Sequence, residues 1–358
     1  MLKTNPAVFI VNDTYEIIVP VDRESIFWIN VGGKDYFDAP CGIMNTDKYV
    51  HKVYVPIDKL NDAGEYTVFC REVLDRKPHK AITGETEEKT YKFCPPPKEN
   101  IKIYNISDAH SRIHEPIAAA KAFGKIDLLI LNGDILDDCA APESFMNVYT
   151  ICSEVTGGNI PIVSSRGNHD VRGKISHKYG EYMPSHKGDI FYTFKAGSVW
   201  GVVLDCGETT NDFDPEYNFT IHCDPFREAQ TEFLKNVIKN SKTEYEADDV
   251  KTKIVVVHDP FFERHTPPYD VSRDTLKEWF DIINPNIKPD FWLCGHAHKC
   301  LVRRPPYSAD EFGINSPLVH VGTPGDNYFM GGGIEINGNE ITVTYTDSNG
   351  EITDGIKL

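Results

Sequence analysis

The segment Pro161–Asp170, with the sequence PIVSSRGNHD, contains a short apolar run that ends in an asparagine, a histidine and an aspartate. Apolar runs of this length, rich in β-branched residues, are typical of buried strands. In open α/β sheets, ligands bind beyond the carboxyl ends of the strands. The segment therefore predicts a strand that delivers Asn168, His169 and Asp170 to a site at its carboxyl end.

Four other apolar runs also end in residues that bind metals or move protons. They are Lys102–Ser107 followed by Asp108 and His110, Leu128–Asn132 followed by Asp134, Lys253–Val257 followed by His258, and Phe291–Cys294 followed by His296 and His298. Carboxylates and imidazoles are common ligands of transition metals, and two neighbouring metals can activate a water molecule. Five such strand ends at one edge of a sheet predict a two-metal hydrolytic site.

From about residue 98 onward, predicted strands alternate with predicted helices, which favours βαβ units. The expected helices are Pro116–Phe123, Pro142–Val155, a segment beginning at Asp224-Pro225, and Ser272–Ile283. Two antiparallel strands are expected over Ile190–Lys195 and Val199–Asp205. Gly167 and Gly295 are expected to let the backbone turn sharply beside the site.

Residues 1–95 have an all-β pattern, and their spacing suggests an immunoglobulin- or fibronectin-like sandwich. The expected strands are Ala7–Val11, Tyr15–Val21, Ser25–Val31, Lys34–Phe37, His51–Ile57, Glu65–Val73 and Lys89–Cys94, with a turn at Asn61–Gly64. Pro95–Pro97 then reads as a stiff linker. We therefore expect a β-sandwich domain over residues 1–95 and a larger α/β domain over residues 98–358.

Composition narrows the range of partners and compartments. The formal charge of −17 makes long nucleic acid a poor substrate, because polyanions are repelled. No apolar run reaches the roughly 18 residues of a membrane span, and the first residues lead into a β pattern rather than a signal-peptide core. The nine cysteines form no CxxC pair, which indicates reduced thiols and a cytoplasmic location.

The order Asp-x-His, Gly-Asp, Gly-Asn-His-Asp, a single His and Gly-His-x-His, over about residues 100–336, resembles the calcineurin-like metallophosphoesterase family. The resemblance implies a four-layer α/β/β/α sandwich that follows the small β-sandwich. It also implies a phosphatase or phosphodiesterase with two divalent or trivalent metal ions, such as manganese, iron or zinc. Such an enzyme cleaves a small phosphomonoester or phosphodiester with a metal-bridging hydroxide.

The family's roles carry over to single residues of this sequence. Asp108, His110 and His298 resemble ligands of the first metal, Asn168, His258 and His296 resemble ligands of the second, and Asp134 resembles the carboxylate that bridges both. His169 resembles the residue that hydrogen-bonds the phosphate and protonates the leaving group, and Asp170 would orient His169. Arg166 and Arg172 flank the third motif, where phosphate binding is conceivable but solvated surface arginine is the safer interpretation.

A β-sandwich before a phosphoesterase domain is similar to the layout of purple acid phosphatases, but the motifs depart from that branch. His110 stands where those enzymes have a non-ligand residue, and Asp137 stands where they place a metal-binding tyrosine. Asp170 replaces a glutamate. The chain is therefore expected to lack the tyrosinate-to-iron absorption that gives that branch its colour.

Two other functions compete with the phosphohydrolase. In the first, the β-sandwich binds a partner, whose identity the sequence does not indicate, and the metal domain is a scaffold. In the second, the chain is a nuclease of the same superfamily, which the acidic balance and the lack of a basic stripe oppose. Substrate specificity is expected to lie in the loops Cys206–His222 and Phe261–Val271.

Overall fold

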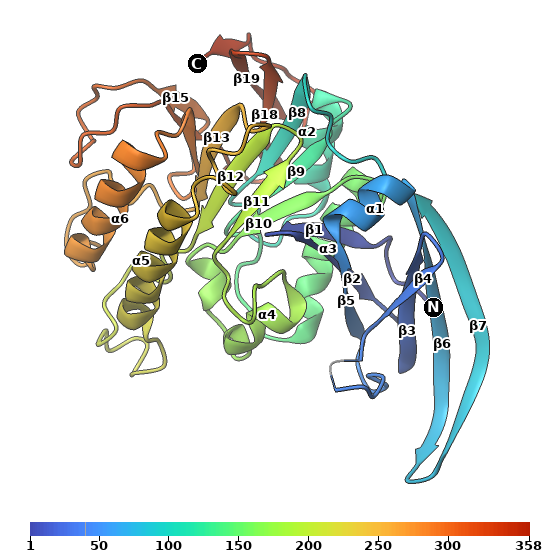
Figure 1. Ribbon diagram of the computed structural model, residues 1–358. Helices are drawn as coiled ribbons and strands as arrows, with labels where there is room; N and C mark the ends of the chain where they lie inside the picture. Colours follow the sequence, from blue (N-terminus) through green and yellow to red (C-terminus); the bar gives the residue numbers. More distant parts are fainter. Residues whose placement is uncertain (40) are drawn as a thin grey trace.

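The computed structural model describes residues 1–39 and 41–358, which are organised by three β-sheets (Figure 1). The largest has the strand order β20-β19-β18-β8-β9-β10-β1-β2-β5, with β17 paired to β18. Its strands are β1 (Ala7–Val11), β2 (Thr14–Pro20), β5 (Val50–Pro56), β8 (Ile101–Ile106), β9 (Leu128–Asn132), β10 (Ile162–Ser165), β17 (Thr323–Gly325), β18 (Tyr328–Asn337), β19 (Glu340–Asp347) and β20 (Ile356–Lys357). Strands β8, β9 and β10 are parallel neighbours, so their carboxyl ends lie at the same edge.

The second sheet has six strands in the order β11-β12-β13-β14-β16-β15. These strands are β11 (Tyr192–Ala196), β12 (Val199–Leu204), β13 (Thr252–Val257), β14 (Phe291–Cys294), β15 (Leu301–Arg303) and β16 (Leu318–His320). Strands β12, β13, β14 and β16 run parallel. The antiparallel pair β11 and β12 confirms the two strands predicted in the middle of the chain.

Helices cover the outer faces of both sheets, and the inner faces pack against each other. Helices α2 (His114–Phe123) and α3 (Met146–Thr156) bury their apolar sides on the larger sheet, and α5 (Cys223–Lys239) and α6 (Arg273–Asn286) do so on the smaller one. The shorter helices are η1 (Pro142–Phe145), η2 (His169–Val171), η3 (Ser176–Lys178) and α4 (Tyr179–Tyr182). Between the sheets, Leu128 and Ile130 share one apolar core with Val256 and Leu293. The arrangement confirms the predicted α/β/β/α layers.

The N-terminal strands are divided between two sheets. Strands β1, β2 and β5 extend the larger sheet, because β1 pairs in parallel with β10. The remaining strands form a third sheet in the order β4-β3-β6-β7, made of β3 (Ser25–Val31), β4 (Lys34–Phe37), β6 (Glu65–Lys77) and β7 (Lys80–Lys92). This sheet packs Phe27 and Ile29 into the same core as Val53 and Val55 of β5. A β-sandwich is therefore present, but one of its layers continues into the α/β body, and residue 95 does not separate the sheets.

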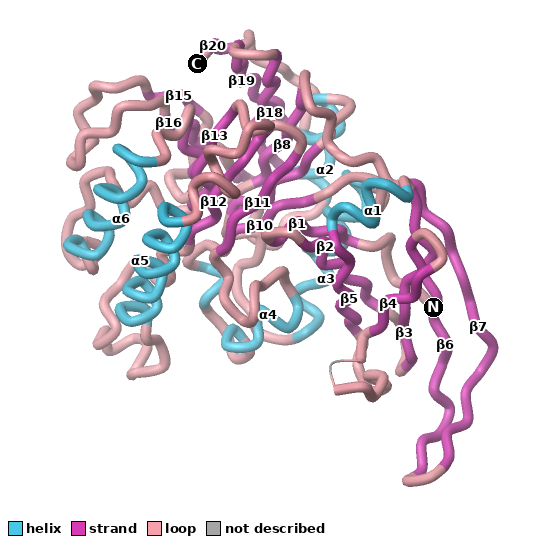
Figure 2. The backbone as a smooth tube through the Cα atoms, viewed as in Figure 1, coloured by secondary structure: helices cyan, strands magenta, loops and turns pink. Residues whose placement is uncertain are grey.

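Two details of the N-terminal region differ from expectation. The predicted turn at Asn61–Gly64 is the end of a short helix, α1 (Ile57–Ala63), which Gly64 closes in the left-handed conformation with φ of 65°. Strands β6 and β7 are longer than predicted and form a hairpin that projects from the body (Figure 2). The helix was missed because only Leu60 is buried, so its sequence has no apolar periodicity.

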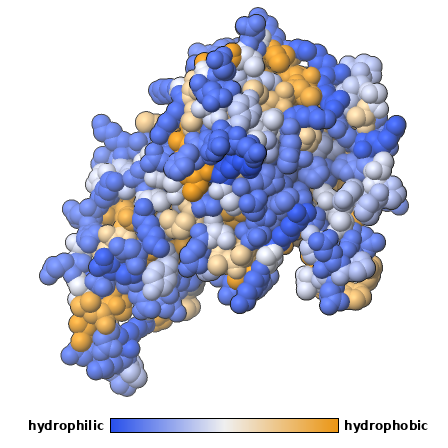
Figure 3. Space-filling model, turned by 180° about the vertical axis from the view of Figure 1, so that it is seen from behind, coloured by the Kyte–Doolittle hydropathy of each residue, from blue (hydrophilic) through white to orange (hydrophobic). Residues whose placement is uncertain are grey.

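Hydrophilic residues dominate the face drawn in Figure 3, and apolar residues gather there only in small, separate groups. One of these groups lies on the projecting hairpin, which carries the exposed side chains of Leu74 and Ile82. None of the described helices is long and apolar enough to cross a bilayer.

Candidate metal centre

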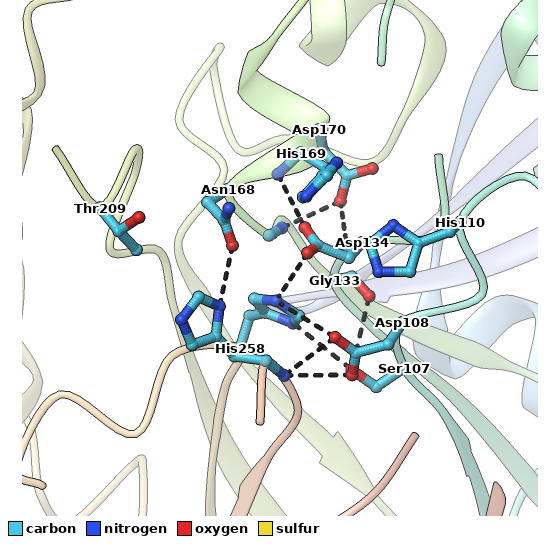
Figure 4. A network of polar contacts seen from close by, with 12 residues as sticks. Ser107, Asp108, His110, Gly133, Asp134, Asn168, His169, Asp170, Thr209 and His258 are labelled. Carbon is cyan, nitrogen blue, oxygen red and sulfur yellow. Dashed lines mark hydrogen bonds and ion pairs between the residues drawn. The ribbon is translucent and has the colours of Figure 1, made fainter. Parts of the chain in front are cut away.

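The five predicted strand ends meet in one place, although they come from two sheets. Strands β8, β9 and β10 of the larger sheet lead into Asp108, Asp134 and Asn168, while β13 and β14 of the smaller sheet lead into His258 and His296. Figure 4 shows the side chains of Asp108, Asp134, Asn168 and His258 converging on a common centre. The site therefore lies where the carboxyl ends of the parallel strands of both sheets come together.

The first group of potential ligands consists of Asp108, His110 and His298, whose donor atoms lie within 4.8 Å of one another. Nε2 of His298 is 3.3 Å from Oδ1 of Asp108 and 3.1 Å from Nε2 of His110. Two imidazole nitrogens that face each other beside a carboxylate suit a shared cation better than a hydrogen bond between them.

The second group consists of Asp134, His258 and His296, again with donor atoms within 4.8 Å. Nε2 of His258 is 3.1 Å from Oδ2 of Asp134, and Oδ1 of Asn168 is 3.0 Å from Nδ1 of His296. Asn168 therefore joins this group through its amide oxygen. The structure thus brings together all seven residues that the sequence predicted as metal ligands.

His258 provides the sharpest test of whether these residues suit a cation. Its Nδ1 is 2.8 Å from the backbone oxygen of Asn132, which assigns the proton to Nδ1 and leaves Nε2 free to bind. Nε2 is buried and forms no hydrogen bond of good geometry among the described residues, yet it faces carboxylate oxygens of Asp134 at 3.1 Å and of Asp108 at 3.8 Å. A nitrogen lone pair and carboxylate oxygens that face one another repel unless a proton or a metal ion lies between them, so the residues fit a bound metal.

The charges at the site point the same way. Burial alone would lower the pKa of His258, but the carboxylates of Asp134 and Asp108 outweigh it and raise that pKa to about 10. Burial would likewise raise the pKa of Asp134, yet the charge of His258 holds it below its ordinary range. Both carboxylates are almost completely buried. The site therefore attracts positive charge, which a proton on His258 supplies when no cation does.

The backbone of the site is strained where it carries the potential ligands. Asp108, His110, Asp134, His296 and His298 all have positive φ angles, between 46° and 64°. Such a conformation costs a non-glycine residue roughly 1 kcal/mol or more and tends to persist at functional sites. Five of the seven predicted ligands thus hold their side chains in place at an energetic cost.

Gly167 and Gly295 have a different role from the one we expected. Neither has a positive φ, so neither makes the sharp left-handed turn. A Cβ atom at Gly167 would instead lie 2.2 Å from Oδ1 of Asp134, and one at Gly295 would lie 1.8 Å from Oγ of Ser107. The two glycines are required because any side chain would displace the carboxylate or its neighbour.

His169 lies at the edge of the centre, with its ring edge-on to His110 at 4.6 Å between the ring centres. Its Nδ1 is 3.2 Å from the backbone oxygen of Asp137, and its Nε2 is 3.0 Å from Nη1 of Arg172. A carbonyl only accepts and a guanidinium only donates, so both contacts assign the proton to Nδ1. His169 also forms a third group of potential ligands with His110 and Asp137, whose donor atoms lie within 4.8 Å of one another. Because Arg172 occupies its Nε2, we expect His169 to contact substrate rather than metal.

Asp170 does not orient His169 as we expected. Its carboxylate accepts hydrogen bonds from the backbone N–H groups of Asp134 (2.9 Å), Gly167 (2.9 Å) and Leu136 (3.2 Å). Burial, and then the nearby charge of Asp134, raises the pKa of Asp170 to about 7. A cation bound by Asp134 would offset the second cause. Asp170 therefore positions the loop that carries Asp134.

Replacing Asp170 by alanine should lower the free energy of unfolding by about 3 kcal/mol, because three buried N–H groups lose their acceptor. Asparagine keeps one carbonyl oxygen and should lose less. Urea unfolding of wild type and both variants measures the difference. A loss below about 1 kcal/mol for Asp170→Ala would show that water replaces the carboxylate and that this anchoring role is wrong.

Sequence reasoning missed the side chains that surround His169. Arg172 was interpreted as a solvated surface residue, but it forms an ion pair with the fully buried Glu208. Arg166 is likewise paired with the buried Asp205, at 2.6 Å. Glu208 lies in a loop with no recognisable motif, and a separation of 36 residues leaves no periodic signal that could pair it with Arg172.

Comparisons with known proteins agree with this geometry. The model of a protein family described as calcineurin-like phosphoesterase matches residues 101–300. A solved structure of the purple acid phosphatase PPD1 from yellow lupin (Lupinus luteus) seeds superposes with a TM-score of 0.61 at 12% identity, covering 99% of this chain and 73% of that one. A structure of PhoD gives a TM-score of 0.55 at 14% identity, covering 95% of this chain and 85% of that one. At these identities the two structures show the fold alone, and no curated protein matches the chain.

Proposed function

We propose, since the chain belongs to the calcineurin-like phosphoesterase family, that this metal-dependent phosphohydrolase uses two metal ions to cleave a small phosphomonoester or phosphodiester. Manganese, iron and zinc are the candidate metals, because all three accept carboxylate and imidazole ligands. Asp108, His110 and His298 would hold one ion and Asn168, His258 and His296 the other. Asp134 would contribute one oxygen to each.

The observation that carries the proposal is that the two ligand groups lie side by side. Nε2 of His258 is 3.1 Å from Oδ2 of Asp134 in its own group and 3.8 Å from Oδ1 of Asp108 in the other. Oδ1 of Asp134 accepts the backbone N–H of His169 at 2.8 Å. A shared anion is what two adjacent cations require, because they repel each other. When bound, the cations would lower the pKa of a bound water and neutralise charge on the phosphoryl oxygens.

The chain's own side chains would then hold and orient the substrate. Asp170 fixes the backbone of Asp134 through three hydrogen bonds, so the carboxylate does not have to reorganise during the reaction. His169 would hydrogen-bond a phosphoryl oxygen and supply the proton that the departing alkoxide needs. In the arrangement described, Nε2 accepts from Arg172 and carries no proton, so His169 would first have to give up that bond and take up a proton on Nε2 from solvent.

Elemental analysis followed by an activity assay tests the proposal. The purified chain should contain about two metal ions and should hydrolyse para-nitrophenyl phosphate, its bis-ester, or both, in the presence of manganese. A metal-loaded protein that hydrolyses neither compound, nor any member of a wider phosphoester panel, would refute the enzymatic function. That result would favour the non-catalytic binding protein.

The protein should be colourless when it is loaded with iron. The proposed ligands are carboxylates, imidazoles and an amide. Asp137 stands where purple acid phosphatases place a metal-binding tyrosine, and its carboxylate is 3.3 Å from Nδ1 of His110. Without a tyrosinate ligand, no strong charge-transfer band should appear in the visible absorption spectrum. A strong band in the iron-loaded protein that disappears on reduction would contradict the ligand set.

A further inference from the structure

A fixed arginine lies beside His169 and is not explained by the metal centre. Nε of Arg172 donates to Oε2 of Glu208 at 2.8 Å and to the hydroxyl of Tyr217 at 3.1 Å, and Nη2 donates to Oε1 of Glu208 at 3.2 Å. Nη1 points the other way and donates to Nε2 of His169 at 3.0 Å. The guanidinium therefore bridges the loop that carries Glu208 and the third motif.

The loop that carries Glu208, the partner of Arg172, is itself firmly anchored. Glu208 is fully buried, and its carboxylate also accepts the hydroxyl of Tyr217 and the backbone N–H of Thr209. The buried Arg227 donates to the backbone oxygens of Cys206 and Glu208, which ties the start of the loop to α5. A carboxylate with this many donors keeps its charge and its position, so the guanidinium plane is set before any substrate arrives.

Arg172 has donors to spare. A guanidinium has five N–H bonds, one on Nε and two on each terminal nitrogen. Among the described residues, Arg172 uses one N–H of Nη1 and one of Nη2, so each terminal nitrogen keeps one hydrogen without a protein partner. The side chain is 34% exposed, which leaves these hydrogens within reach of a ligand.

We propose that Arg172 is a phosphate-binding residue of this site, with Glu208 and Tyr217 as its positioning residues. Arg172 would donate to a non-bridging phosphoryl oxygen on the side away from the metals, next to His169. Both phosphomonoesters and phosphodiesters offer such an oxygen, and inorganic phosphate offers it too. A planar guanidinium held by a carboxylate is well suited to this contact, since its direction is fixed. The inference rests on the proposed function and adds to it the residue that grips the phosphoryl group.

Kinetics of three variants test the assignment, using para-nitrophenyl phosphate as substrate and inorganic phosphate as inhibitor. Arg172→Met should raise both KM and the inhibition constant of phosphate about 10- to 100-fold, with kcat within threefold of wild type. Arg172→Lys should give values of both constants between those of wild type and Arg172→Met, because lysine keeps the positive charge but lacks the planar pair of terminal N–H donors. Glu208→Gln should also raise KM, since an amide cannot accept from both nitrogens of the guanidinium.

The matched control is Arg23→Met, the same change at an exposed arginine outside both predicted specificity loops. Arg23 is 46% exposed and pairs with Asp22 and Glu72. This variant should leave KM and the phosphate inhibition constant unchanged. All variants should contain as much metal as wild type by elemental analysis, because neither Arg172 nor Glu208 belongs to any of the three groups of potential ligands.

Two results would overturn the assignment. One is an Arg172→Met enzyme whose KM and phosphate inhibition constant stay within twofold of wild type. The other is a loss confined to kcat, which a merely structural role would give. If wild type hydrolyses no phosphoester, the proposed function fails, and calorimetric titration of the metal-loaded protein with inorganic phosphate decides instead. Weaker binding by Arg172→Met then supports the role of Arg172, and equal affinity or no binding by wild type refutes it.

Discussion

Replacing Asp134 by asparagine should lower kcat/KM for para-nitrophenyl phosphate by at least about 1,000-fold. The carboxylate is 2% exposed and belongs to the second group of potential ligands, which lies beside the first. Asparagine has nearly the same shape, but its amide carries no charge and its nitrogen donates rather than accepts. Two neighbouring cations would lose the anion that they share. Steady-state kinetics together with elemental analysis measure both consequences.

The matched control for this prediction is Asp58→Asn, which makes the same change at an exposed position of α1. Asp58 is 62% exposed, and Lys59 is its one ion-pair partner within the described part of the chain. This variant should retain wild-type kinetics and metal content. An Asp134→Asn enzyme that keeps both metals and falls less than tenfold in kcat/KM would show that the bridging role is wrong.

The second large effect separates metal binding from proton transfer. His258→Ala should lose metal and activity together, because Nε2 of His258 is the buried nitrogen of the second group that faces the carboxylates of Asp134 and Asp108. His169→Ala should keep its metal and lose about 100- to 10,000-fold in kcat, as expected for the loss of a general acid. Elemental analysis and kcat, measured on the same samples, distinguish the two histidines.

One outcome would contradict the separate roles of His169 as proton donor and His258 as metal ligand. If His169→Ala loses metal as readily as His258→Ala, His169 is a ligand rather than the proton donor. The hydrogen bond between Nε2 of His169 and Arg172 argues against that result, because it occupies the nitrogen that a metal would need. Both variants should unfold at similar urea concentrations when metal is removed, which would exclude a trivial loss of structure.

The metal centre could be predicted from the sequence because each part of it sits directly after a buried strand. The run before Asp134 is apolar from Leu128 to Leu131, and those before Asp108 and His258 are mostly apolar and buried, so strand and strand end are both visible. The apolar runs by themselves did not divide these strands between two sheets, and only the resemblance to the family implied the second sheet. Strand pairing depends on contacts over long separations, such as that of β13 with β14, and no local pattern records them.

The N-terminal region was predicted less completely for the same reason. Its strands were predicted, but the sequence pattern of β1 is compatible both with a strand of a small sandwich and with a strand of a larger sheet. Every residue of β1 is buried, which is typical of a strand inside a parallel sheet, and this distinguishes it from β3, whose residues alternate. The expected division into domains of residues 1–95 and 98–358 remains a prediction that limited proteolysis can test.

The contacts around His169 were beyond sequence reasoning. Arg172 and Glu208 are 36 residues apart, and Tyr217 lies in the same unpatterned loop as Glu208. Charged residues in loops are normally solvated, so the sequence favoured a solvated surface position for Arg172. Only the burial of Glu208 shows that the pair is part of the site's wall.

The most direct measurement is anomalous X-ray diffraction from crystals grown with manganese. We expect two anomalous peaks at the site, one beside Asp108, His110 and His298 and one beside Asn168, His258 and His296, with the Asp134 carboxylate between them. A single peak, or peaks away from Asp134, would contradict the shared carboxylate on which the proposed reaction depends.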